Sequence, residues 1–211
     1  MQMQDEQITG NQPEMQEQAQ QPDKEKKSFG KELLSWIVTL GMAVIIAFTI
    51  RTFLFEPIRV DGESMCDTLQ DGEIMLVTKP EYLFGDPQVG DVVVCHYPER
   101  GNTNFVKRVI GVPGDTITIE NGVVYRNGEA VEEPYLTPSR NQGSYYDITE
   151  PFVLGDDEYF VCGDNRDNSH DSRNYYTLGW GQYQPAAVTR NMIKGHVRWV
   201  VFPFGNARGI E

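Results

Sequence analysis

A single long apolar run near the amino terminus sets the first limit on how this chain can fold. Residues 33–50 read LLSWIVTLGMAVIIAFTI, eighteen residues without a charge. At about 1.5 Å per residue, a helix of this length spans roughly 27 Å, which is close to the hydrocarbon thickness of a bilayer. We therefore expect one transmembrane anchor over residues 29–55.

The charges that flank this run predict its orientation. Four lysines lie within residues 24–31, whereas only Arg51 and Arg59 follow the run closely. Because basic residues favour the cytoplasmic side, we expect a single-pass protein of the plasma membrane with its amino terminus in the cytoplasm. A cleavable secretory signal would have a shorter apolar core and a small-x-small site after it, and the RTFLFEPIRV that follows contains no such site. A buried soluble helix would have a polar face, which this run lacks.

The remaining composition divides the chain into a tail and one sizeable domain. Residues 1–28 are rich in glutamine and nearly free of apolar side chains, so they are expected to form a disordered cytoplasmic tail. Residues 56–211 contain many short runs of Val, Ile, Thr and Tyr between glycines and prolines, which favours strands and turns. We expect an extracytoplasmic, mostly β domain with an insertion around residues 120–155.

Seven segments of this domain have the composition of β-strands. The dipeptides Asn121-Gly122 and Asn127-Gly128 favour tight turns, and the first is expected to join two strands as a hairpin. The polar stretch over residues 132–151 is expected to be a loop or insertion. The predicted strands cover residues 73–78, 91–97, 105–110, 116–120, 123–126, 159–162 and 196–202.

Charge and cysteine content exclude several classes of function. The formal net charge is −13, and no basic face is evident for binding nucleic-acid phosphates. Cys66, Cys95 and Cys162 form no CxxC pair and no zinc-ligand spacing with histidine, so we expect small, part-buried apolar residues. One pair of them could still form a bridge outside the cell. No metal or cofactor is expected.

Two stretches carry residues suited to nucleophilic chemistry. Residues 60–69 read VDGESMCDTL and place Ser64 in a turn, which by itself is ordinary for a serine. Residues 104–115 read NFVKRVIGVPGD, and in a strand Lys107 and Arg108 point to opposite faces, so at least one is expected on a covered face. Lysine is the one that can lose its proton, since burial lowers its pKa. The alternative is an edge strand with both side chains in solvent.

A third stretch, GDNRDNSHDSR at residues 163–173, is almost wholly polar and follows an apolar strand. Its Asp, Asn, Ser and Gly residues suit a turn tied by hydrogen bonds from side chains to the backbone. The DxDxDG order of a calcium-binding EF-hand loop is absent from it. Two acids and two arginines within it are able to pair and brace the loop: Asp164, Asp171, Arg166 and Arg173.

In this order behind an apolar run, VDGESMCDTL, FVKRVIGVPGD and GDNRDNSHDSR resemble the motifs of the bacterial type I signal peptidases. The resemblance covers essentially the whole chain from the run onward. It implies a β-rich catalytic core with a second, smaller β region, in a membrane-bound serine endopeptidase that removes amino-terminal signal peptides from exported preproteins. It implies Ser64 as the nucleophile, Lys107 as the general base and Ser169 as the residue that orients the lysine amine. An acyl-enzyme intermediate follows from such a serine–lysine dyad.

The same resemblance assigns supporting residues. The third stretch matches a structural motif of the family. In that motif an acid and an arginine form a bracing ion pair, and the matching residues are Asp171 and Arg173. Asp164 and Arg166 belong to the same motif. The family's apolar substrate pockets leave space for small residues only, which fits cleavage after small-x-small. The matching pocket residues are Val60, Met65, Leu69 and Val106.

Two positions depart from the family pattern. Gly62 stands where some members have a serine whose hydroxyl is the second oxyanion donor, so that a backbone N–H or a water must substitute. Asp67 stands where the family usually has proline, which predicts a looser turn after Ser64.

Two other functions are compatible with parts of the sequence. An inactive, membrane-tethered protein that binds signal peptides without cutting would need the anchor and the fold, but not Ser64, Lys107 and Ser169. A cysteine transpeptidase of the sortase type would use Cys66 or Cys162 with a histidine, but that family's TLxTC motif is absent. The candidate histidines for it are His96, His170 and His196.

Overall fold

The computed structural model describes residues 29–97, 103–142, 146–174, 176–178 and 182–210. The tail expected over residues 1–28 lies outside these ranges. By its internal contacts the chain divides into two units, residues 1–43 and 44–211. The first unit contains the start of one long helix, and the second contains its end and every described strand.

The amino-terminal helix α1 (Phe29–Thr49) continues into a turn of π-helix, η1 (Ile50–Leu54). None of its residues is buried against protein, and the helical stretch is long and apolar enough to cross a membrane. The hydroxyls of Thr39 and Thr49 each donate to a carbonyl oxygen one turn back at 2.8 Å, which satisfies these polar groups inside the helix. Such a helix requires an apolar environment, which fits a membrane anchor.

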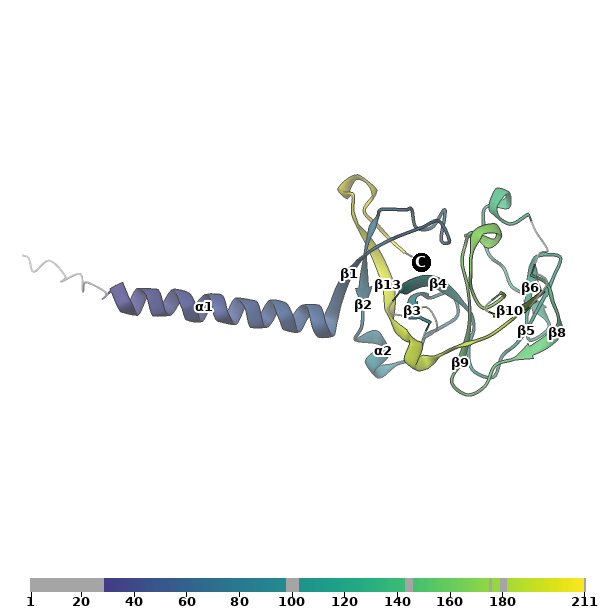
Figure 1. Cartoon of the computed structure of the whole chain (residues 1–211), viewed down its shortest axis with the longest axis horizontal. Helices are drawn as coiled ribbons and strands as arrows, with labels where there is room; N and C mark the ends of the chain where they lie inside the picture. Colours follow the sequence, from purple (N-terminus) through teal and green to yellow (C-terminus); the bar gives the residue numbers. More distant parts are fainter. Residues whose placement is uncertain (1–28, 98–102, 143–145, 175, 179–181, 211) are drawn as a thin grey trace, which may run out of the picture. The chain divides into compact units, whose positions relative to one another are not determined.

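An eight-stranded antiparallel sheet forms the larger part of the second unit (Figure 1). Its order is β1-β2-β13-β3-β4-β9-β12, and β14 pairs with β13. Among the described residues, β1 pairs only with β2, and β4 pairs with β9 only from Arg108 onward. The strands are β1 (Phe55–Arg59), β2 (Ile74–Thr78), β3 (Val92–His96), β4 (Asn104–Gly111), β9 (Glu158–Cys162), β12 (Val188–Thr189), β13 (Ile193–Phe202) and β14 (Arg208–Gly209).

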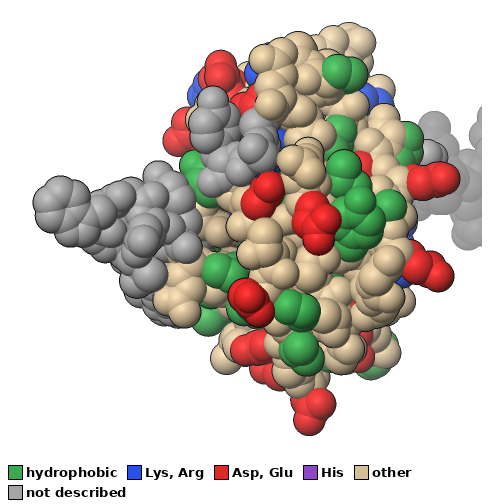
Figure 2. Space-filling view, turned by 90° about the vertical axis from the view of Figure 1, so that its right-hand side faces the viewer, with side chains coloured by type: hydrophobic (Ala, Val, Ile, Leu, Met, Phe, Trp, Pro, Cys, Tyr) green, Lys and Arg blue, Asp and Glu red, His purple; other side chains and the backbone are tan. Residues whose placement is uncertain are grey.

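A second, smaller sheet has the order β7-β6-β5-β8. It shares a core cluster with β4 and β9 of the large sheet, so the two sheets pack together in one unit. Figure 2 views the molecule from the side on which Figure 1 draws this sheet, and it shows acidic side chains scattered over the face. The strands are β5 (Thr116–Glu120), β6 (Val123–Arg126), β7 (Glu129–Ala130) and β8 (Ile148–Val153).

The connections contain short helical turns and one small hairpin. The hairpin pairs β10 (Tyr176–Leu178) with β11 (Gln182–Gln184). The helical turns are α2 (Glu81–Phe84), η3 (Pro138–Arg140), η4 (Arg166–Asn168), η6 (Arg190–Met192) and η7 (Phe204–Asn206).

The expected fold class, mostly β with a second smaller β region behind one apolar helix, is confirmed. All seven predicted strands occur, and their ends agree within one residue except that β13 begins earlier, at Ile193. The predicted hairpin joins β5 to β6 through Asn121 and Gly122, which have φ angles of 52° and 78°. Asn and Gly are the residues that adopt this left-handed conformation most readily.

The loop expected over residues 132–151 is only partly a loop, because residues 148–151 begin β8. Ile148 is buried opposite Ile119 of β5, and this contact sets the pairing. Pro151 is tolerated because β8 is an edge strand of its sheet. The strand β1 contains Pro57 and also lies at an edge, which explains why its pattern does not predict a strand.

Gly195 of β13 provides a sharp test of this packing. A Cβ at this position would lie 2.6 Å from the carbonyl oxygen of Thr78 in β2, which cannot move without breaking the sheet. We expect Gly195→Ala to lower the free energy of unfolding by about 1–3 kcal/mol. The measurement is urea unfolding of the detergent-solubilised protein, followed by tryptophan fluorescence.

Gly205→Ala is the matched control, since a Cβ there would meet nothing within 4 Å. Equal unfolding midpoints for the two variants would contradict the close approach of β13 and β2.

Candidate active site

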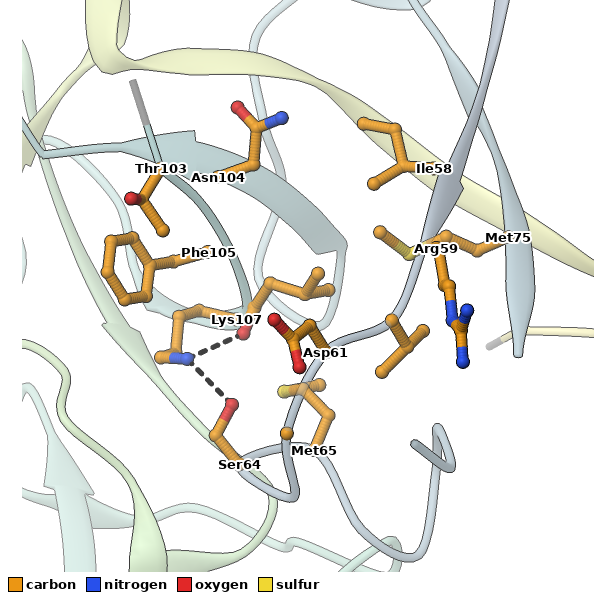
Figure 3. A pocket seen from close by; sticks show the side chains of 13 residues that line it. Ile58, Arg59, Asp61, Ser64, Met65, Met75, Thr103, Asn104, Phe105 and Lys107 are labelled. Carbon is orange, nitrogen blue, oxygen red and sulfur yellow. Dashed lines mark hydrogen bonds between the residues drawn. The ribbon is translucent and has the colours of Figure 1, made fainter. Parts of the chain in front are cut away.

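Ser64 lies in the turn between β1 and β2, and the hydrophobic core holds this turn in place. The next residue, Met65, is buried, and its carbonyl oxygen accepts a hydrogen bond from the Leu69 N–H at 2.8 Å. Before the serine, Gly62 has a φ of +98° and donates its N–H to Asp71 Oδ1 at 2.9 Å. The backbone is thus tied on both sides of Ser64, whose side chain faces Lys107 (Figure 3).

Lys107 of β4 reaches this turn from the opposite wall. Its Nζ lies 2.9 Å from Ser64 Oγ, in hydrogen-bond contact, and donates to the Val106 carbonyl oxygen at 2.8 Å. The side chain is 1% exposed, and this desolvation lowers its pKa because burial penalises the charged form. A neutral amine held against a hydroxyl is able to take the proton from that hydroxyl.

Both charged residues of β4 are buried. Lys107 is buried on one face of β4, and Arg108 is 2% exposed on the other. The alternative of an edge strand with both side chains in solvent is therefore wrong. Arg108 donates two hydrogen bonds to Asp164, at 3.0 and 2.8 Å, and its guanidinium stacks 3.9 Å from the ring centroid of Tyr135.

The third polar stretch meets the Ser64 turn directly. The Asn165 N–H donates to the Ser64 carbonyl oxygen at 3.0 Å, and the Asn165 side-chain amide donates to Glu63 O, also at 3.0 Å. Ser169 is buried beside this contact, and its Oγ has no hydrogen-bond partner among the described residues. The structure thus brings Ser169 to the site without a hydrogen bond between its hydroxyl and the Lys107 amine.

Glycine is required where these two segments meet. A Cβ at Gly163 would lie 2.4 Å from the Ser64 carbonyl oxygen and 2.2 Å from Ser169 Oγ. No side chain fits in this space, so Gly163 allows the backbone of the loop to reach the backbone of the nucleophile turn.

Arginine–carboxylate pairs surround the site, but only one is internal to the third stretch. Arg173 pairs with Asp171 through two hydrogen bonds, at 2.9 and 2.8 Å. Burial alone would raise the pKa of Asp171, but the Arg173 guanidinium and the hydrogen bond from the Gly163 N–H contribute to holding that pKa below its usual range. Asp164 pairs instead with Arg108 on β4.

Arg166 finds its partner outside the motif. Its guanidinium makes a two-point contact with Glu133, with Nη1 donating to Oε2 at 3.0 Å and Nη2 donating to Oε1. Both side chains are buried. Sequence reasoning did not find Glu133, because it lies in a polar stretch with no pattern that distinguishes it from the exposed Glu132.

Asp67 does not loosen the turn after Ser64, contrary to expectation. Its carboxylate accepts a hydrogen bond from Thr137 Oγ1 at 2.7 Å and lies 3.3 Å from Arg140 Nε. These contacts tie the nucleophile turn to η3. A carboxylate–loop contact therefore holds the turn where the family has proline.

A cavity of about 300 Å³ opens beside the Ser64–Lys107 pair (Figure 3). Three of the four expected pocket residues line it, namely Val60, Met65 and Val106. The fourth, Leu69, is fully buried in the core and is not among the lining residues. Further apolar walls come from Ile58, Met75 and Phe105.

The cysteines have the environment of core residues. All three are buried and free. Burial raises the pKa of Cys95 to about 11 and that of Cys162 to about 12, and it also raises the pKa of Cys66. Thiols with a raised pKa form less of the nucleophilic thiolate, which argues against a cysteine transpeptidase. The described residues contain no cluster of His, Cys, Asp and Glu that could hold a metal ion.

A serine hydroxyl held against a buried amine is an arrangement that suits a serine peptidase. The family model described as signal peptidase, peptidase S26, matches residues 33–202. Signal peptidase I of Bacillus amyloliquefaciens is 40% identical over 191 residues, which cover 88% of this chain and 97% of the relative. Signal peptidase I S of Bacillus subtilis strain 168 is 37% identical over 190 residues, 87% of this chain and 97% of the relative.

The chain belongs to the signal peptidase family, peptidase S26. It is a serine peptidase whose family removes signal peptides from preproteins, and the resemblance drawn from the three motifs is confirmed. A solved signal peptidase I from Enterococcus faecalis V583 aligns with 54% of this chain and 97% of its own length, with 28% identity and a TM-score of 0.41.

Glu133 offers a direct test of the buried pairs. Glu133→Ala leaves the Arg166 guanidinium buried without its carboxylate, so we expect it to lower the free energy of unfolding by about 3–5 kcal/mol. Urea unfolding monitored by circular dichroism measures the change. Glu132→Ala is the control, since Glu132 is exposed. The pair would be unimportant for stability if both variants unfolded at the same urea concentration.

Proposed function

We propose that this protein cleaves signal peptides from exported preproteins with Ser64 as the nucleophile and Lys107 as the general base. The observation that carries the proposal is the 2.9 Å contact between Ser64 Oγ and the buried Lys107 amine. A serine hydroxyl becomes a useful nucleophile only when a base takes its proton, and a lysine is a base only when neutral. Burial supplies that neutral form, because it lowers the pKa of Lys107.

The reaction proceeds in two stages. As Ser64 Oγ attacks the scissile carbonyl, Lys107 takes the hydroxyl proton, and it then gives this proton to the amine of the departing mature protein. The acyl-enzyme on Ser64 is hydrolysed by a water that Lys107 deprotonates in the same way. The hydrogen bond from Nζ to the Val106 carbonyl oxygen fixes the direction of the amine. The proposed role of Ser169 is to orient the same amine during the reaction, since its buried hydroxyl has no other partner among the described residues.

The oxyanion is stabilised at the Ser64 turn. The backbone N–H of Ser64 supplies one donor. Gly62 has no side chain, and its N–H is used by Asp71, so the second donor is another backbone N–H or a water.

The substrate binds as an extended strand between two sheet edges. β1 pairs only with β2, and the part of β4 before Arg108 is unpaired with β9, within the described residues. Main-chain hydrogen bonds at such edges give affinity, and alternate side chains enter pockets. Val60, Met65 and Val106 leave little room, which selects small residues and favours cleavage after small-x-small.

The site works close to the plasma membrane. The helix over residues 29–54 crosses the bilayer with the amino terminus in the cytoplasm and the β domain outside, because lysines cluster before it. Lys79 donates to Thr52 O at 3.3 Å and pairs with Glu56, so the β domain begins immediately at the end of the helix. A net charge of −13 disfavours nucleic acid as a partner.

Removal of the nucleophile tests the assignment. We expect Ser64→Ala to lower kcat on a purified preprotein by at least about a thousandfold, because no other hydroxyl occupies its position. The assay incubates the detergent-solubilised enzyme with the preprotein and maps the product by mass spectrometry. Ser139→Ala, an exposed serine on η3, is the control. Wild-type cleavage by folded Ser64→Ala would refute Ser64 as the nucleophile, whereas a folded wild-type protein that binds the preprotein but never cuts it would favour the inactive binding protein.

The base has its own signature in the pH profile. Because the pKa of Lys107 is lowered, its neutral fraction grows at a lower pH than for a free lysine. We expect kcat/KM to rise with pH along an acid limb whose midpoint lies below about 10.4, the value of an unperturbed lysine. Lys107→Arg should be inactive throughout, since arginine keeps its proton. A midpoint at or above the value of free lysine would rule out a desolvated base.

A further inference from the structure

The cleft beside the dyad contains a carboxylate that the fold does not use. Asp61 lines the same cavity as Ser64 and Lys107 and is exposed. Figure 3 shows its carboxylate on the side of the chain toward these two residues, whereas the Arg59 guanidinium lies on the other side. Within the described part of the chain, Asp61 makes no hydrogen bond or ion pair.

Three other carboxylates near the site have structural partners. Asp67 contacts η3, Asp164 pairs with Arg108, and Asp171 pairs with Arg173. The Lys107 amine contacts Ser64 Oγ and the Val106 carbonyl oxygen and makes no ion pair with Asp61. The unpaired Asp61 carboxylate in the cleft is therefore available to a group from outside the protein.

The pleat of an extended substrate indicates which of its residues meets Asp61. Along the cleft wall, Val60 turns into the core, and the next residue, Asp61, turns toward solvent. Side chains of a bound strand alternate in the same way. Small residues that point toward Val60 and Met65 leave the intervening side chain on the exposed side, where the Asp61 carboxylate lies.

We propose that Asp61 forms a subsite for a cationic side chain, lysine or arginine, at the residue between the two small residues before the scissile bond. This proposal rests on the proposed function. The carboxylate attracts a cation and repels an anion at that position, through an exposed interaction that added salt screens.

The test uses three otherwise identical signal-peptide substrates that carry Lys, Gln or Glu at the intervening residue. For each enzyme, kcat/KM is divided by the value for its own Gln substrate. We expect the wild-type enzyme to prefer Lys over Glu about three- to tenfold at low ionic strength, and less in high salt. Asp61→Asn should bring the ratio of kcat/KM for the Lys substrate to that for the Glu substrate near one, and Asp61→Lys should make the enzyme prefer Glu.

Asp156→Asn is the matched control, because Asp156 is an exposed carboxylate outside the cleft lining, and it should keep the wild-type ratio. The subsite is refuted if Asp61→Asn retains the preference of the wild-type enzyme, or if that enzyme shows none. Failure of the proposed function looks different: folded Ser64→Ala would then cut all three substrates as fast as the wild-type enzyme.

Discussion

The burial of the Lys107 amine against the Ser64 hydroxyl is the interaction on which the rest of this structure depends. An amine in water keeps its proton at neutral pH and cannot act as a base. Here the amine contacts one hydroxyl and one carbonyl oxygen, and none of the described carboxylates pairs with it. Desolvation therefore lowers its pKa without an opposing ion pair. The fold must bury the amine and at the same time keep every carboxylate from pairing with it.

The neighbouring cations show how the fold meets this requirement. Arg108, Arg166 and Arg173 are all buried near the site, and each makes a two-point contact with its own carboxylate. Removing one partner from such a pair is costly, because the remaining charge has no solvent. These three arginines are therefore neutralised by their own carboxylates, and the Lys107 amine, which has no such partner, is the group whose pKa burial lowers.

Local patterns predict much of this fold, but few of the contacts that build the site. The alternation of residues 116–120 and the Asn-Gly turn after them depend on neighbours in sequence, so their strand and hairpin could be predicted. The edge strands β1 and β8 each contain a proline and owe their pairing to a distant partner. The three motifs indicated Ser64, Lys107 and Ser169, whereas the partnership of Arg166 with Glu133 depends on a loop that only the tertiary fold brings near.

Gly163 shows why the three motifs act as one unit. The loop after β9 and the nucleophile turn meet backbone to backbone, since the Asn165 N–H donates to the Ser64 carbonyl oxygen. A Cβ at Gly163 would occupy this contact, 2.4 Å from that oxygen. The contact fixes the peptide plane that follows Ser64, and the buried Met65 fixes the chain beyond it. The direction of the Ser64 side chain toward Lys107 thus depends on a glycine about one hundred residues away in sequence. Because no residue with a Cβ fits at Gly163, this glycine is part of the site.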